Sequence, residues 1–184
     1  MKLEKIIKQT NNKFLNMFTA NYKNEDGKDY NYFFCSRREH NLQNADVCDA
    51  VKILPYISST NEIIFIKNFR YALNDFLYEL PAGLVDANEN LLEAAKRELS
   101  EETGATVLNA TEISGIGSTS AGLTDETIKL YFAEVELNGK QHLDEFENIK
   151  VVKVNANNVL EFMKNNKVDI ITELMVKLFL AEKR

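Results

Sequence analysis

The chain has 184 residues, the usual size of one domain with room for a small N-terminal extension. With 45% apolar residues it can bury a full core, and no stretch approaches the roughly 18 to 20 apolar residues that a membrane span needs. The net charge of −6 disfavours a nucleic-acid partner, because such partners select for a basic surface. The N-terminus lacks the apolar core of a signal peptide, so we expect a cytoplasmic protein.

The first part of the chain has the pattern of a small β unit. Residues 3–37 contain apolar and aromatic clusters on both sides of Asn24–Lys28, and the Asp-Gly pair in this segment is typical of a hairpin turn. We therefore predict an antiparallel N-terminal β unit over residues 1–45, followed by a main domain over residues 46–184.

The rest of the chain mixes strands and helices without a regular repeat. Apolar runs between turn residues predict strands, and apolar stripes at helical spacing predict helices. The predicted strands are Asp49–Ser58, Glu62–Lys67, Leu77–Leu80, Ala110–Gly115, Thr127–Leu137 and Lys150–Val154, and the predicted helices are Leu91–Thr103, Val159–Asn165 and Ile170–Glu182. A polar loop, Gly117–Glu126, separates two of the strands. This mixture indicates an α+β fold or an α/β/α sandwich.

Three glutamates crowd one side of the predicted helix Leu91–Thr103. Around the helix axis, Glu102 lies roughly 40° and Glu101 about 60° from Glu98. Like charges at this spacing repel one another, and acidic groups near a helix C-terminus oppose the helix dipole. A cation should therefore lie among them, and oxygen ligands suit Mg²⁺, with Mn²⁺ as an alternative. On this helix alone, an exposed acidic face remains the alternative interpretation.

The helix belongs to a longer motif. The segment Gly83–Ala105 resembles the Nudix box, GX5EX7REUXEEXGU, with every fixed letter present. At background residue frequencies, a chance match anywhere in the chain is on the order of 10⁻⁸. The resemblance implies a Nudix-type α/β/α sandwich with a mixed sheet and Mg²⁺-dependent hydrolysis of a pyrophosphate bond. It also implies a structural ion pair between Arg97 and Glu89. The metal ligands that it implies are the backbone carbonyl of Ala82 and the carboxylates of Glu98, Glu101 and Glu102.

Segments outside the box resemble the ADP-ribose pyrophosphatase branch of this family. They are the ELPAG lead-in at Glu79–Gly83, the Phe69–Tyr71 segment, the loop Ser120–Glu126 and the acidic segment Asp144–Val151. In this branch the arginine of the second segment meets the substrate, and guanidinium groups match phosphate geometry. The substrate-binding candidates are therefore Arg70, Ala82, Gly83, Gly122 and Glu126.

The acidic segment supplies two further candidates. The resemblance implies that Glu145 is the general base for water and that Glu147 is a further metal ligand, with the reverse assignment and an ordinary acidic turn as alternatives. The catalytic candidates are then Glu145, Glu101 and Glu102.

The substrate is left open by one departure from the branch pattern. Ala121 stands where the branch has a proline in its SPG triplet, and alanine restricts the loop less than proline does. We expect a nucleoside diphosphate substrate, first ADP-ribose, cleaved to AMP and ribose 5-phosphate, and then GDP-mannose or ADP-glucose. A non-catalytic nucleotide sensor and an RNA-decapping enzyme are weaker alternatives. Subunits of this branch pair through the N-terminal β unit, which helps to build the partner's substrate site, so the resemblance also implies a homodimer.

Overall fold

The structure is a computed structural model that describes residues 1–39 and 47–183. Its residues fall into two units by their contacts. The first unit combines Met1–Asp49 with Ile116–Ile128, and the second combines Ala50–Gly115 with Lys129–Arg184. The boundary that the sequence predicts between residues 45 and 46 lies outside the described residues.

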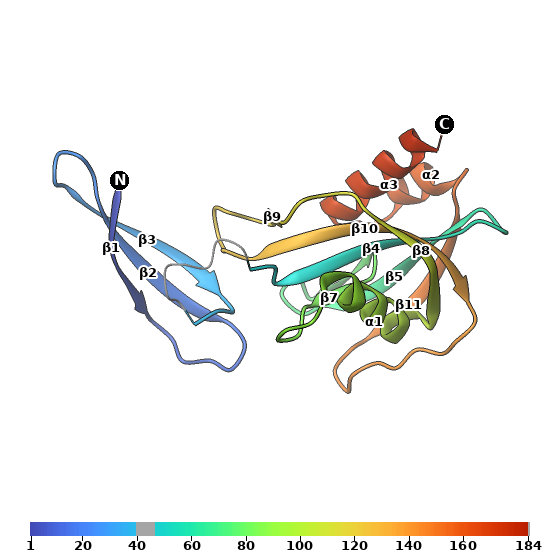
Figure 1. Ribbon diagram of the computed structural model, residues 1–184, viewed down its shortest axis with the longest axis horizontal. Coiled ribbons are helices and arrows are strands. Elements are labelled where there is room, and N and C mark those ends of the chain that lie inside the picture. The colour runs from blue at the N-terminus through green and yellow to red at the C-terminus, as the bar shows by residue number, and fades with distance from the viewer. Residues whose placement is uncertain (40–46, 184) are drawn as a thin grey trace. The chain divides into compact units, whose positions relative to one another are not determined.

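The first unit contains a three-stranded antiparallel sheet. Its strands are β1 (Lys2–Lys8), β2 (Asn16–Lys23) and β3 (Asp29–Ser36), in the order β1-β2-β3 (Figure 1). Asn24 closes the hairpin between β2 and β3, because its side-chain oxygen accepts the Lys28 backbone N–H at 2.8 Å and its carbonyl accepts that of Gly27 at 3.1 Å. Gly27 has φ of 77°, which favours glycine. The predicted hairpin and β unit are confirmed.

The polar loop after Ile116 is bound to this first unit. It contains the short strand β9 (Gly117–Ser118), which pairs with the start of β10 (Thr127–Leu137). The Cys35 backbone N–H donates to the Leu123 carbonyl at 2.9 Å, and the Tyr32 hydroxyl donates to the Gly122 carbonyl at 2.6 Å. The loop is therefore held along β3, although Tyr32 and Gly122 are 90 residues apart in sequence.

The second unit is built around a larger sheet in the order β11-β5-β4-β10-β8, with β6 beside β5 and β7 beside β4. Its further strands are β4 (Ala50–Ile57), β5 (Glu62–Arg70), β6 (Asp75–Glu79), β7 (Ala82–Leu84), β8 (Ala105–Glu112) and β11 (Ile149–Asn155). Most neighbours are antiparallel. In contrast, β4 and β10 run in the same direction, since Asp49 N–H bonds the Thr127 carbonyl at their starts and Ser58 bonds Glu134 near their ends. The sheet is therefore mixed, as predicted.

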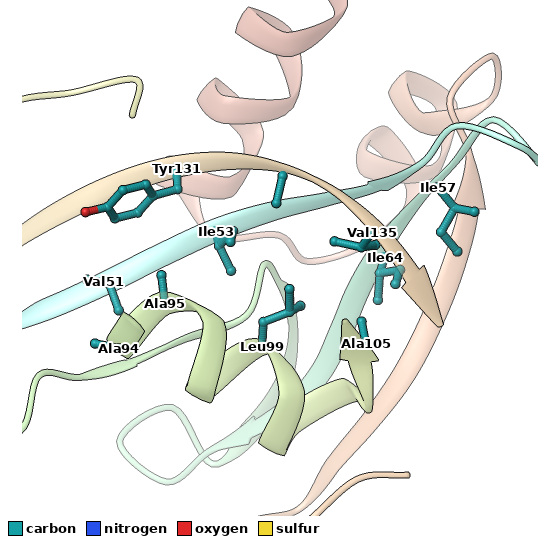
Figure 2. Packing of buried hydrophobic residues seen from close by; sticks show 11 residues of the cluster. Val51, Ile53, Ile57, Ile64, Ala94, Ala95, Leu99, Ala105, Tyr131 and Val135 are labelled. Atoms are coloured by element: carbon teal, nitrogen blue, oxygen red, sulfur yellow. The ribbon is translucent and has the colours of Figure 1, made fainter. Parts of the chain in front are cut away.

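Helices cover both faces of this sheet. Helix α1 (Leu91–Thr103) lies on one face, and α2 (Val159–Asn165) and α3 (Ile170–Glu182) lie on the other (Figure 1). Side chains of β4 point alternately toward the two helix layers, as expected for a strand that is buried on both faces. Val51 and Ile53 point toward α1, with Val51 near Ala94 and Ile53 near Leu99, as Figure 2 shows, whereas Leu54 packs toward α2 and α3. The predicted α/β/α sandwich is confirmed.

One strand begins earlier than predicted. The sequence predicts a strand over Ala110–Gly115, whereas β8 spans Ala105–Glu112. Gly104 explains the difference, because it caps α1 in the left-handed conformation with φ of 74° and turns the chain directly into the strand. In the described residues, no helix has the length and apolar character to cross a membrane.

Candidate active site

Helix α1 begins and ends at residues that fix its position. At its N-terminus, the Asn90 side-chain oxygen accepts the backbone N–H groups of Leu92 at 2.9 Å and Glu93 at 3.4 Å. At its C-terminus, a Cβ on Gly104 would come within 2.6 Å of the carbonyl carbon of Gly139. This close approach, together with the Gly139 N–H that donates to the Gly104 carbonyl at 2.8 Å, anchors the helix end to the segment after β10.

Glu102 is the deepest carboxylate of this helix. It is only 4% exposed, and its Oε2 accepts the Ala82 backbone N–H at 3.0 Å. Burial raises the pKa of Glu102 to about 8, the Ala82 N–H opposes this shift, and the nearby charges of Glu98 and Glu147 add to it. The ionised form of Glu102 therefore needs a positive charge that the surrounding protein supplies only in part.

Glu98 lies directly against the backbone of Gly83. A Cβ built on Gly83 would be 2.0 Å from Cδ of Glu98, so this position accepts no side chain while Glu98 keeps its place. Burial raises the pKa of Glu98, Arg97 opposes this, and the charges of Glu101 and Glu147 reinforce it. The box glycine thus makes room for a half-buried carboxylate.

Arg97 ties the loop before the helix to the helix itself. Its Nε and Nη2 bond the two oxygens of Glu89, each at 2.9 Å, and Nη2 also bonds the Leu84 carbonyl at 3.0 Å. Its Nη1 reaches Glu98 at 2.8 Å and Glu101 at 3.1 Å. Arg97 lowers the pKa of Glu89 to about 2, so this pair stays charged near neutral pH. The predicted structural ion pair is confirmed.

A cavity of about 480 Å³ collects these groups. Glu98, Glu101 and Glu102 line it from α1, and Glu147 lines it from the segment between β10 and β11. Its other lining residues are Ala82, Gly83, Leu84, Asp86, Arg97, His142 and Asp144. The structure therefore brings together, in one hollow, all five positions that the sequence proposes for metal binding.

Hydrogen bonds to backbone carbonyls of α1 hold the segment of residues 138–148 against this helix. The His142 backbone N–H donates to the Glu101 carbonyl at 2.8 Å, and the Gln141 side-chain amide donates to the Glu102 carbonyl at 2.7 Å. These bonds satisfy carbonyls at the helix C-terminus, which otherwise lack partners. They also bring Glu147 to the cavity.

The remaining candidates lie at other places. Glu145 is exposed and is absent from the cavity wall. Arg70 ends β5 and lies outside the wall as well, with its Nε bonded to the carboxylate of Glu79. Gly122 and Glu126 belong to the first unit. There the Gly122 carbonyl accepts from Tyr32, and Glu126 accepts from the Thr119 hydroxyl at 3.2 Å.

The donor set fits a hard divalent cation. All the ionisable donors are carboxylates, except for His142, and carboxylate oxygens are the preferred protein ligands of Mg²⁺. Among the described residues, no group of three or more His, Cys, Asp or Glu side chains is arranged to hold an ion. In the cavity, Arg97 bonds Glu98 and Glu101, and the Ala82 N–H bonds Glu102. The raised pKa of the buried Glu102 shows that the site favours added positive charge.

Four cavity residues were not among the sequence candidates, namely Leu84, Asp86, His142 and Asp144, although Asp144 belongs to the acidic segment. His142 and Asp86 line the cavity, although neither stands in a pattern that predicts a site. His142 is isolated in sequence, and it reaches the cavity because its own backbone N–H is bonded to the end of α1. Asp86 follows the box glycine by three residues, which is the one signal that would have pointed to it.

The fold and the site define a class of protein, and comparison with known proteins gives the same class. The NUDIX domain model matches residues 46–174, so the chain belongs to the Nudix family of hydrolases. A solved structure described as an ADP compounds hydrolase superimposes with a TM-score of 0.76 at 19% identity, over 100% of this chain and 96% of that one. This likeness confirms the fold.

Relatives by sequence include a member of the predicted branch. The chain is 35% identical over 121 residues to the ADP-ribose pyrophosphatase of Bacillus subtilis, which covers 65% of this chain and 64% of that protein. It is 29% identical over 157 residues to an uncharacterized Nudix hydrolase of Schizosaccharomyces pombe, covering 81% of this chain and 75% of that protein. The resemblance that the box and its flanking segments indicate is confirmed.

Proposed function

We propose that the protein hydrolyses the pyrophosphate bond of a nucleoside diphosphate sugar in a Mg²⁺-dependent reaction, with ADP-ribose as its first substrate. The observation that carries this proposal is that Glu98, Glu101, Glu102 and Glu147 line the same cavity. Four carboxylates in one hollow repel a free diphosphate, so they suit an anionic substrate only together with bound cations.

The proposed roles are those of metal ligands and of a general base. Glu98, Glu101, Glu102, Glu147 and the carbonyl of Ala82 would hold Mg²⁺, or Mn²⁺ in its place. When bound, such ions neutralise phosphate oxygens and lower the pKa of a coordinated water. The general base would be Glu145, as the resemblance implies, or in the reverse assignment Glu147, which lines the cavity, and it would accept the proton of the water that attacks one phosphorus. The P–O bond to the second phosphoryl group breaks, so that water and ADP-ribose give AMP and ribose 5-phosphate.

The contacts to the rest of the substrate follow from the resemblance. Arg70 and the backbone at Ala82 and Gly83 would bind phosphate, and Gly122 and Glu126 would contribute from the loop of the first unit. Ala121 leaves that loop more freedom than a proline would, which favours tests of GDP-mannose and ADP-glucose beside ADP-ribose.

A substrate panel tests the reaction. The purified protein with Mg²⁺ is offered ADP-ribose, GDP-mannose, ADP-glucose and diadenosine polyphosphates, and products are identified by mass spectrometry. We expect ADP-ribose to be cleaved fastest of the panel, to AMP and ribose 5-phosphate. Chelation of the metal should abolish turnover. If no member of the panel is cleaved with Mg²⁺ or Mn²⁺, the protein is a nucleotide-binding rather than a catalytic member of the family.

A matched pair of variants tests the carboxylate site. Glu102→Gln keeps the shape of the buried side chain but removes its charge, so we expect turnover to fall by about two orders of magnitude or more. Glu93→Gln on the same helix is the control, because Glu93 is exposed and, within residues 1–39 and 47–183, its carboxylate pairs only with Lys96. Circular dichroism verifies that both variants fold. Equal activity of the two variants would exclude a metal-binding role for Glu102.

The expected assembly and location also remain proposals. We infer a homodimer whose first unit takes part in pairing, as the family resemblance implies, in the cytoplasm. Light scattering at micromolar concentration tests the pairing, and a monomer under those conditions would contradict it.

A further inference from the structure

Glu79 is a buried carboxylate that the proposed reaction does not use. It is 4% exposed and ends β6, directly before the turn that leads to Ala82. Both of its oxygens accept from Nε of Arg70, at 2.8 and 3.1 Å. A buried carboxylate needs a charged or hydrogen-bonding partner, and Arg70 supplies one to Glu79.

The way in which Arg70 makes this pair leaves most of its donors available. Only Nε is bonded to Glu79, and within the described residues neither Nη group makes a hydrogen bond or ion pair. A guanidinium carries four N–H bonds on its two Nη atoms. The Arg70 side chain is 45% exposed, so these donors are open to solvent.

The chain links this pair to the segment that contacts the metal-binding helix. Glu79 precedes Ala82 by three residues, and the Ala82 backbone N–H donates to Oε2 of Glu102 at 3.0 Å. Arg97, the other arginine of the site, is occupied by Glu89, Glu98 and Glu101. Arg70 lies outside the cavity wall, and in the described part of the chain its terminal donors are unengaged.

We propose that Glu79 is a positioning residue, which fixes the guanidinium of Arg70 through Nε so that both Nη groups present to a phosphate of the substrate. This inference rests on the proposed function. Held at Nε, the group cannot rotate about its last bonds, and less conformational entropy is lost when phosphate binds. The alternative is that the pair only stabilises the β5–β6 hairpin.

A double-mutant cycle separates these roles. The measured quantity is the affinity for α,β-methylene-ADP, a diphosphate that is not cleaved at its central bond, by calorimetry with Mg²⁺ present. The variants are Glu79→Gln, Arg70→Gln and the two together, each checked for its unfolding temperature. We expect each single change to weaken binding about tenfold, and Glu79→Gln to add less than about twofold once Arg70 is absent, as coupled residues do.

The outcomes distinguish this inference from the function that it rests on. Failure of the wild-type protein both to bind the analogue and to cleave the panel would overturn the proposed function and the inference together. If the wild type binds, an equal loss of affinity from Glu79→Gln in both backgrounds, or a lower unfolding temperature with unchanged affinity, would overturn the positioning role alone.

A further variant keeps the test decisive if Glu79→Gln does not fold. Arg70→Lys retains the positive charge but lacks Nε and the planar group that Glu79 holds. We expect its affinity to stay within about threefold of that of Arg70→Gln, because a flexible ammonium is not held in place. Affinity equal to that of the wild type would show that charge alone suffices and would overturn the positioning role.

Discussion

At the scale of single residues, Gly83 shows how the site depends on the absence of a side chain. A Cβ at Gly83 would meet the end of the Glu98 side chain at 2.0 Å, and this end can move aside at small cost to the fold. We therefore expect Gly83→Ala to unfold at nearly the wild-type denaturant concentration, while turnover falls by about a hundredfold because a metal-binding carboxylate is displaced.

The control for this variant is another glycine of the same unit. A Cβ at Gly115 meets nothing within 4 Å, so Gly115→Ala should change neither turnover nor stability. Turnover and denaturant midpoint are measured for both variants. Wild-type turnover in Gly83→Ala would show that Glu98 is not required where the structure has it.

The sequence predicted the residues of this site unevenly, for physical reasons. The glutamates of α1 could be predicted, because helical geometry fixes their relative directions and the box gives their spacing. Glu79 and Arg70 could each be named from the flanking motifs, but their contact depends on the β5–β6 hairpin. His142 reaches the cavity through a backbone hydrogen bond, which no side-chain pattern encodes.

At the scale of elements, the start of α1 depends on one side chain. The Asn90 oxygen accepts two backbone N–H groups of the first helical turn, which have no partner within the helix. We expect Asn90→Ala to lower the free energy of unfolding by about 1 kcal/mol, the usual effect of removing such a cap. Urea unfolding followed by circular dichroism measures this change.

Helix α2 supplies the matched control. Asn158 occupies the same position at its start but makes no side-chain cap hydrogen bond. Asn158→Ala should therefore have a much smaller effect than Asn90→Ala. Equal effects of the two changes would mean that helix propensity, and not the cap, accounts for the loss.

The elements themselves were largely predictable. The bounds predicted for all three helices agree with the structure, because α1 has a cap residue at each end and α3 begins after the cap residue Asp169. The strand after α1 was placed five residues late, because alternation in Ala105–Glu112 is weak and much of the strand is exposed. Apolar alternation predicts a strand only where one face is buried.

At the scale of the whole molecule, sequence order conceals which segments lie together. Residues 116–128 belong to the first unit by their contacts. For example, the Ser36 hydroxyl donates a hydrogen bond to the Asp125 carboxylate at 3.1 Å. Nothing in the composition of a polar loop predicts this partner. The layers of the second unit, in contrast, follow from alternation, since apolar residues on both sides of a strand require a helix layer on each face.

The response of the second unit to acid depends on a buried ion pair between those layers. Lys52 of β4 contacts Asp169 before α3 at 2.9 Å, and their side chains are 7% and 17% exposed. Burial raises the pKa of Asp169, but Lys52 and the hydrogen bonds of Thr172 outweigh burial and hold it below the ordinary 3.8. A lowered folded-state pKa stabilises the protein above the unfolded value, and this stabilisation is lost as the pH falls through the folded value.

We therefore expect Asp169→Asn to be less stable than wild type at pH 7 by about 3 to 5 kcal/mol, because Lys52 loses its buried partner while asparagine keeps the helix cap. The difference should shrink as the pH falls below 3.8 and through the lower folded-state pKa of Asp169, where Asp169 itself becomes protonated. Asp75→Asn, in an exposed pair with Lys167, is the control and should match the wild type. Urea unfolding from pH 7 to 3 measures this, and a difference independent of pH would show that the charge of Asp169 does not stabilise the fold.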